Sequence, residues 1–417
     1  MARRFQLCWI GTPGGGKRVY DYCSKAISVG YRHFDTVRFT LMAVKSITNR
    51  GELGLQRLQA MVKNILCRNE EAVGQAIRDS GIPREEFFVT TKLNDHFRVR
   101  ETFEESLKNL GLEYVDLYLM HWPQAMTNWY MKPSSDGKSQ YLVADALAPE
   151  ESPTFVETWQ AMEKLVETGK VKAIGVSNFS IKNLEILLPH CKIIPATNQV
   201  EAHPYLPNHE LKAYCESKGI LLTAYSPLVN HGSENLTIRL LSQGQPRPDV
   251  PVGLLDNSDI QAIADRLNVE PAQVLISWAV QRGTIAIPKT ENERRMVTNM
   301  TLVTLSDDDM KTLDNIHRKP GLHRSLLVGL HGEDGKVFGW TYEQLGWNMT
   351  TGGSGGMDPY TILAKMQFST RTILSAVILY LAVNTMAAPA PAAEVQADIV
   401  ARQQCTGNNF SDTTLCP

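Results

Sequence analysis

Polar side chains suited to acid–base and carbonyl chemistry stand at the ends of a series of short apolar runs. Asp35, Lys92 and His121 each end one such run. The pattern recurs farther along the chain, at Ser177, Asn178, Gln199, Glu201, Tyr225, Ser226 and Lys289. The carboxyl ends of parallel strands meet at one face of a sheet or barrel, where α/β enzymes place their active sites. A lone histidine or lysine there is more often structural, so it is the repetition that predicts one shared site.

The apolar runs alternate regularly with amphipathic stretches. Eight runs begin near residues 5, 31, 87, 115, 171, 193, 220 and 284. Helices are predicted at 19–29, 70–79, 99–110, 153–168, 180–189, 208–218, 257–268 and 271–282. Continuous apolar strands with crossover helices predict a parallel sheet, and eight of them predict a (β/α)8 TIM barrel. A doubly wound open sheet is the alternative, disfavoured because no GxGxxG motif opens the first unit.

Composition narrows the classes of partner. The chain has 417 residues, 43% of them apolar, and 42 Lys plus Arg balance 44 Asp plus Glu for a net charge of -2. This charge gives no reason to expect nucleic acid or an anionic membrane as a partner, so a small-molecule ligand is favoured. The 7 cysteines form no CxxC pair, and no zinc site, other metal site or disulfide framework is predicted. Because the N-terminus lacks a secretion signal, we expect a cytoplasmic protein, and we expect a monomer.

A glycine-rich segment, Gly11–Lys17, nearly matches the sequence motif of a phosphate-binding loop. The motif requires Ser or Thr after the lysine to bind magnesium, and this chain has Arg18 instead. We interpret the segment as a strand-to-helix turn.

Taken in chain order, several segments match a known family. They are Gly30–Thr36, Asn69–Glu71, Thr91–Leu93, Asp116–Pro123, Gly175–Phe179, Asn198–Tyr205, Ala224–Leu228 and Ile287–Lys289. Through them the sequence resembles the aldo-keto reductases, and Phe338–Trp347 is similar to fungal members that interconvert glycerol, glyceraldehyde and similar small polyols and aldehydes. The resemblance implies an NADP(H)-dependent oxidoreductase, acting on a small carbonyl or polyol substrate.

The resemblance also implies a role for each matched residue. Asp35 and Lys92 would form a buried pair that tunes a tyrosine acid, and His121 would hold and polarise the carbonyl, with Trp122 beside the substrate. The nicotinamide end of the cofactor would meet Ser177, Asn178, Gln199, Tyr225, Ser226 and Leu228. The adenosine end would meet Lys289, Thr290, Arg295 and Asn299, where two cations and a hydroxyl favour NADP over NAD. One of Arg294 and Arg295 is expected to lie on a solvated helix face.

The chain departs from the family at the tyrosine. Counting back from Asn69 places Cys67 at that position, and residues 37–66 stand where the family pattern has only three positions. A thiol is a weak hydrogen-bond donor and a poor substitute acid. The alternative function is therefore a catalytically impaired NADP(H)-binding homologue. We interpret 37–66 as a retained intron or gene-model error.

The C-terminal part is predicted to lie outside the barrel. A barrel over 1–350 would be followed by a flexible linker at 351–365, because Thr351–Gly356 is rich in glycine. Residues 366–417 begin like a signal peptide, with an apolar stretch too short for a membrane span. Fusion with the start of a secreted protein is the favoured interpretation, and a tail anchor is the second.

Overall fold

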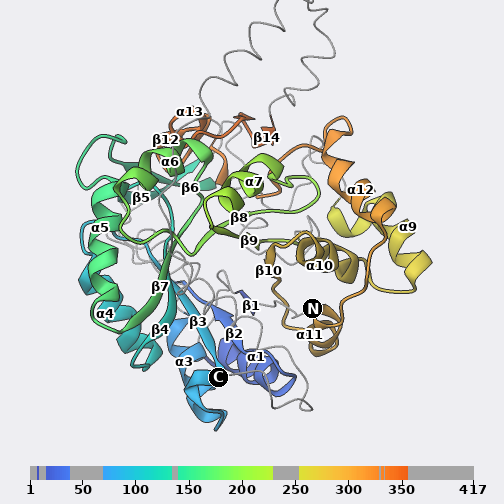
Figure 1. Cartoon of the computed structure of the whole chain (residues 1–417), viewed down its shortest axis with the longest axis horizontal. Helices are drawn as coiled ribbons and strands as arrows, with labels where there is room; N and C mark the ends of the chain where they lie inside the picture. The colour runs from blue at the N-terminus through green and yellow to red at the C-terminus, as the bar shows by residue number, and fades with distance from the viewer. Residues whose placement is uncertain are drawn as a thin grey trace, which may run out of the picture.

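The computed structural model describes residues 7–8, 16–37, 69–133, 140–228, 253–327, 330–332 and 334–355. Within them, one parallel sheet has eight strands in the order β1-β2-β3-β4-β7-β8-β9-β10 (Figure 1). Their bounds are β1 Leu7–Cys8, β2 His33–Asp35, β3 Phe88–Leu93, β4 Val115–Met120, β7 Val171–Ser177, β8 Thr197–Glu201, β9 Leu221–Tyr225 and β10 Ile285–Ile287. This confirms the predicted (β/α)8 barrel and excludes the open sheet, whose strand order would reverse.

Helices follow the strands and cover the outside of the sheet (Figure 1). They are α1 Gly16–Ser28, α3 Glu70–Asp79, α4 Val99–Leu110, α5 Phe155–Val166, α6 Ile181–Leu187, α7 His209–Ser217, α9 Ser258–Leu267, α10 Pro271–Gln281, α11 Glu293–Met300, α12 Asp307–Asn315 and α13 Tyr342–Leu345. Local sequence sets several of their starts. Thr154 accepts a hydrogen bond from the Glu157 backbone while the Glu157 carboxylate accepts one from the Thr154 backbone, which satisfies donors that the first turn of α5 leaves unpaired.

Two layers of core meet at the strands. Leu117 and Leu119 of β4 belong to a small cluster with Phe88, Ala173 and Ala196, while Tyr118 of the same strand belongs to the large cluster shared with the helices. This alternation is what a strand buried on both faces requires. A β-carbon at Gly175 of β7 would lie 2.8 Å from both Leu119 and the Thr197 carbonyl oxygen, so the close approach of β7 to its neighbours needs glycine.

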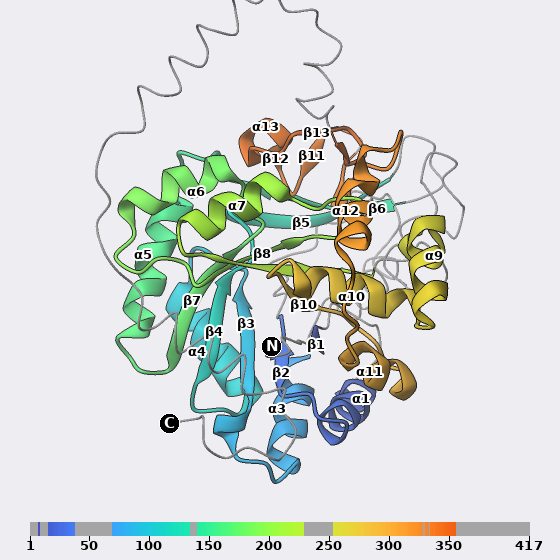
Figure 2. The ribbon, with the colours of Figure 1, turned by 45° about the vertical axis from the view of Figure 1, so that its right-hand side comes forward.

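A hairpin between β4 and α5 adds to the barrel. Strands β5 (Met126–Pro133) and β6 (Gln140–Ala146) pair antiparallel after β4. They lie at the same end of the molecule as the short pairs β11 (Lys336–Val337) with β12 (Trp340–Thr341) and β13 (Met349–Thr350) with β14 (Ser354–Gly355), as Figure 2 shows. These additions build up the end of the barrel that α13 also covers.

The glycine-rich stretch differs from its prediction. We expected a flexible linker at 351–365, but residues 351–355 lie in the β13–β14 hairpin, and the Ser325 backbone donates to the Gly353 oxygen at 2.8 Å. A β-carbon at Gly353 would lie 2.7 Å from the His331 ring, and one at Gly355 would lie 2.2 Å from His323. Glycine is needed here for close packing, so composition alone misled the prediction.

The remainder of the predicted linker and the segment 366–417 lie outside the described residues, as does the insertion after Val37. In the part of the chain that the structure describes, no helix is long and apolar enough to cross a membrane.

Candidate active site

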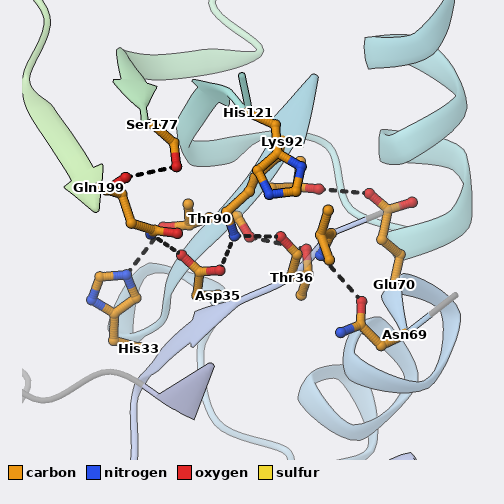
Figure 3. Close-up of polar contacts among 12 residues, drawn as sticks. His33, Asp35, Thr36, Asn69, Glu70, Thr90, Lys92, His121, Ser177 and Gln199 are labelled. Atoms are coloured by element: carbon orange, nitrogen blue, oxygen red, sulfur yellow. Dashed lines mark hydrogen bonds and ion pairs between the residues drawn. The ribbon is translucent and has the colours of Figure 1, made fainter. Parts of the chain in front are cut away.

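A buried ion pair lies at the carboxyl ends of two neighbouring strands. Asp35 is the last residue of β2, and Lys92 is the next to last of β3. The Lys92 ammonium donates to Asp35 Oδ1 and, at 3.1 Å, to the Thr36 carbonyl oxygen (Figure 3). The two side chains are 3% and 0% exposed. A charge at this depth needs a partner, and each residue provides one for the other.

Further hydrogen bonds hold the pair in place. Gln199 of β8 donates from Nε2 to the second carboxylate oxygen of Asp35 at 2.6 Å. The Thr36 hydroxyl donates to the Thr90 carbonyl oxygen at 2.9 Å, and the Thr90 hydroxyl lies 3.1 Å from His33 Nε2. Three strands are therefore linked through polar side chains at one end of the barrel, as predicted for the strand ends.

His121 follows β4 directly, and its backbone donates to the Leu93 oxygen at 3.0 Å. Its Nδ1 lies 2.5 Å from Asn94 Oδ1. Either orientation of the Asn94 amide satisfies this contact: its oxygen accepts from a proton on Nδ1, and its NH2 donates to a bare Nδ1, which leaves the proton on Nε2. Burial, followed by the positive charge of Lys92, holds the pKa of His121 well below its usual range, and the ring is neutral at neutral pH.

Sequence reasoning missed Asn94. Its position in the sequence could have identified it as a candidate site residue. Asn94 stands two residues after Lys92, just past the end of a strand that already carries a polar site residue. Only the pairing of β3 with β4 brings it to His121, and this register is not readable from local sequence.

The residues predicted to meet nicotinamide gather at the ends of β7, β8 and β9. Asn178 donates from Nδ2 to the His121 carbonyl oxygen at 2.9 Å and accepts from the Tyr225 hydroxyl at 2.8 Å. Ser177 donates to the Gln199 carbonyl oxygen at 2.7 Å. Asn178 and Ser226 have positive φ values of 65° and 51°, so both strand ends turn sharply. Leu228 packs against a further buried cluster that includes Val274 and Trp278 of α10, apart from this network.

The residues predicted for the adenosine end lie after β10 and on α11. Lys289 pairs with Glu291 at 3.3 Å, Thr290 is buried, and Asn299 is 2% exposed. Asn299 Oδ1 has no hydrogen-bond partner among the described residues. A buried acceptor of this kind fits a ligand that donates hydrogen bonds, such as an adenine amino group.

The two neighbouring arginines on α11 differ in their surroundings. Arg294 pairs with Glu270 at 2.7 Å with its side chain 79% exposed, which is the solvated face expected for one of them. The Arg295 backbone donates to the Asn292 side chain at the start of the helix.

A pocket of about 310 Å³ adjoins the nicotinamide residues. Its walls include Trp122, Asn178, Tyr225 and Trp347. Trp122 directly follows His121 and packs against Phe338 with ring centroids 5.0 Å apart. The buried indole nitrogen of Trp122 has no hydrogen-bond partner in the part of the chain described. The pocket thus combines aromatic walls with polar side chains, as small-ligand sites commonly do.

Cys67, at the predicted tyrosine position, lies outside the described residues. The residues that flank the insertion do lie within them. The Val37 backbone donates to Asn69 Oδ1 at 3.3 Å, and Glu70 accepts from the Thr91 hydroxyl at 2.7 Å and from Asn109 at 3.0 Å. The chain therefore leaves and rejoins the barrel at one point beside Asp35.

Comparison with known proteins agrees with this geometry. The family model described as Aldo/keto reductase family matches residues 16–318. A glycerol 2-dehydrogenase (NADP(+)) of Saccharomyces cerevisiae is 42% identical over 73% of this chain and 85% of its own length. Aldehyde reductase YPR1 of the same yeast is 39% identical over the same shares.

Solved structures give the same result. An aldo-keto reductase enzyme from a Medee basin deep-sea metagenome library is 32% identical, covers 78% of this chain and 93% of its own, and superposes with a TM-score of 0.54. The aldose reductase of Schistosoma japonicum is 31% identical, with coverage of 75% and 87% and a TM-score of 0.55.

The barrel, the polar site at its strand ends and the relatives together define the class of protein. The chain is a barrel oxidoreductase that uses a nicotinamide cofactor. Within it, this chain belongs to the aldo/keto reductase family.

Proposed function

We propose that the protein interconverts small aldehydes or ketones and the corresponding alcohols or polyols, using NADP(H). One observation carries the proposal: the buried Asp35–Lys92 pair lies at the strand ends that also carry the neutral His121. The names of three fungal relatives, two glycerol 2-dehydrogenases (NADP(+)) and an aldehyde reductase, support the substrate class and the cofactor. Glycerol and glyceraldehyde are accordingly the first substrates to test.

The side chains divide the work as follows. A bound nicotinamide supplies the hydride for carbonyl reduction and accepts it in the reverse direction. Lys92 places a fixed positive charge near the oxygen that becomes an alkoxide, and Asp35 holds that charge in position. His121 would donate a hydrogen bond to the same oxygen from Nε2, and the Lys92 ammonium would supply the proton that the alkoxide takes up. Trp122 lines the substrate pocket and excludes water from it.

NADP(H) is favoured over NAD(H) by the cations at the adenosine end. Lys289 and Arg295 would bind a 2′-phosphate, with Thr290 adding a hydroxyl. Glu291 would release Lys289 for this purpose, since their contact of 3.3 Å joins side chains that are both partly exposed to solvent. Asn299 and its unpaired oxygen would face the adenine.

The second candidate is an NADP(H)-binding homologue that turns over poorly. Cys67 stands at the position of the proton donor, and an unperturbed thiol has a pKa of about 8.5 and is a weak hydrogen-bond donor. In this second candidate the barrel keeps its cofactor residues but lacks an efficient acid for carbonyl reduction.

One experiment separates the two candidates. Titration with NADPH, followed by fluorescence, is combined with turnover of glyceraldehyde and of glycerol. Binding with turnover supports the enzyme. Binding without turnover, restored by Cys67→Tyr together with deletion of 37–66, selects the impaired homologue. Absence of NADPH binding contradicts both.

We also propose the domain organisation and setting of the chain. The barrel unit would extend to about residue 350 together with the hairpin that ends at Gly355, 37–66 would be a retained intron or gene-model error, and 366–417 a fused segment. A transcript that encodes all of 37–66 would contradict the intron, and salt-resistant membrane retention of the full chain would favour a tail anchor. The protein would be a cytoplasmic monomer, which cell fractionation and light scattering test.

A further inference from the structure

Neighbouring residues hold His121 both by its backbone and by its ring. Strands β3 and β4 pair in parallel with Leu93 opposite Met120, so Asn94 and His121 each follow the last paired residue. The His121 backbone donates to the Leu93 carbonyl oxygen at 3.0 Å, and the ring Nδ1 lies 2.5 Å from the Asn94 amide. A water molecule does not fit into so short a contact, so Asn94 bonds the ring directly.

The His121 ring carries a single proton at neutral pH. Burial, and after it the positive charge of Lys92, keep the pKa of His121 well below its ordinary value. The Lys92 charge is itself fixed beside the ring, because Asp35 and the Thr36 carbonyl oxygen hold it (Figure 3). A neutral imidazole has one nitrogen that donates and one that accepts. The partner of Nδ1 therefore decides what Nε2 can do.

The Asn94 amide can present either of its two ends to Nδ1. If its oxygen faces the ring, the proton must lie on Nδ1, and Nε2 can only accept. If its NH2 group faces the ring, Nδ1 is bare and the proton lies on Nε2. A carbonyl oxygen only accepts hydrogen bonds, so a ring that binds an aldehyde or ketone through Nε2 needs the second arrangement.

We propose that Asn94 is a positioning residue for His121: its NH2 group donates to Nδ1 and so keeps the ring proton on Nε2, where it meets the substrate oxygen. This inference rests on the proposed carbonyl reduction. It adds that the hydrogen-bonding character of His121 is set from the neighbouring strand β3, by a side chain that acts through the ring.

The substitution Asn94→Asp should reverse the tautomer. The two side chains have nearly the same shape, but a carboxylate only accepts hydrogen bonds, so Nδ1 must then carry a proton. Asn94 is half-buried, so the new charge would keep some contact with solvent. At pH 8, burial and the charge of Lys92 oppose a second proton on the ring. Nε2 then becomes an acceptor and no longer binds a carbonyl oxygen.

The tautomer is read from nitrogen-15 NMR spectra of the protein labelled at histidine, because a bare ring nitrogen and a protonated one resonate far apart. The signals of His121 are assigned by their loss in His121→Gln. At pH 8 without ligands, the wild-type protein should show a bare Nδ1, and Asn94→Asp should show a protonated Nδ1. The kcat/KM for glyceraldehyde reduction should fall about fivefold, which corresponds to about 1 kcal/mol for one net hydrogen bond. NADPH binding should not change.

Asp95→Asn is the matched control, because it exchanges the same two groups at the next position. Asp95 is buried, and its Oδ1 accepts from the Phe97 backbone at 3.0 Å, a hydrogen bond that asparagine can keep. This variant should leave Nδ1 of His121 bare and glyceraldehyde reduction unchanged.

The outcomes separate this inference from the proposed function. A wild-type protein with the proton on Nδ1 overturns the inference, as does an Asn94→Asp variant whose Nδ1 stays bare, since Asn94 would then only pack against the ring. If Asn94→Asp does not fold, the wild-type spectrum still decides. Failure of the wild-type protein to bind NADPH or to reduce glyceraldehyde counts against the proposed function, whereas the tautomer is read in the ligand-free protein.

Discussion

Replacing Lys92 with methionine tests how much the barrel depends on its buried ion pair. The substitution keeps the length of the side chain and removes the charge, so Asp35 would remain in a site where the carboxylate is 0% exposed. Breaking a buried pair from one side commonly costs about 3–5 kcal/mol. Asp35 keeps the hydrogen bond from Gln199, which places the expected loss near the lower value, at about 3 kcal/mol.

The assay is urea unfolding at pH 7, followed by tryptophan fluorescence, with the free energy of unfolding compared between variants. Lys17→Met is the control, because Lys17 pairs with Asp21 on the surface with side chains 86% and 54% exposed. That pair should contribute little. The double variant Asp35→Asn with Lys92→Met removes both charges and should recover most of the loss. A cost for Lys92→Met no greater than that for Lys17→Met would refute the reasoning.

Three other predictions follow from burial, backbone geometry and charge. Burial lowers the pKa of both His96 and His331 from 6.5 to about 4 in the folded protein. As the pH falls, the unfolded chain therefore takes up protons on these histidines before the folded protein does. The free energy of unfolding should fall between pH 6.5 and 4, by at most about 1.4 kcal/mol per pH unit for each histidine. Urea unfolding across that range measures the slope, which His96→Gln should reduce. Gly353→Ala should destabilise the protein by about 2 kcal/mol or more in thermal unfolding, because it adds a clash with His331 to the strain of φ +76°. Lys289→Met should weaken NADPH binding about fivefold in a fluorescence titration and leave NADH binding unchanged.

Two of these predictions have a matched control within the chain. Gly352 also has positive φ, at +85°, but a β-carbon there would meet nothing within 4 Å, so Gly352→Ala isolates backbone strain from the clash. Equal losses for the two glycine variants would contradict the packing argument. Arg294→Met, which removes the cation paired with Glu270, should leave NADPH binding intact. A flat stability profile from pH 6.5 to 4 would show that the buried histidines titrate normally.

The barrel was predictable because its pattern is local. Apolar runs such as Val115–Met120 alternate with amphipathic helices, and both period and length can be read from the residues. The ends of the strands predicted which polar side chains would gather, and the structure brings Asp35, Lys92 and His121 to the same end of the sheet. Their chemical roles remain predictions.

What the sequence did not reveal depends on distant contacts. The bonds of Gln199 to Asp35 and of Asn94 to His121 arise from tertiary structure, so no spacing in the chain encodes them. The β5–β6 hairpin was not among the predicted strands, and the glycines of 351–355 were interpreted as a linker although two of them allow backbone to pack against histidine rings. In both cases the conformation of the segment depends on the part of the protein against which it packs.

The contact between Val37 and Asn69 has a consequence for how this chain can be altered. Because the two ends of the insertion are already held together, with Val37 and Asn69 both buried, a segment can be added or removed between them without moving any strand. The loop between Val37 and Asn69 can therefore vary in length while the barrel keeps its structure. Its two ends lie beside the ion pair, so a short bridge and a long insertion are both compatible with the same scaffold.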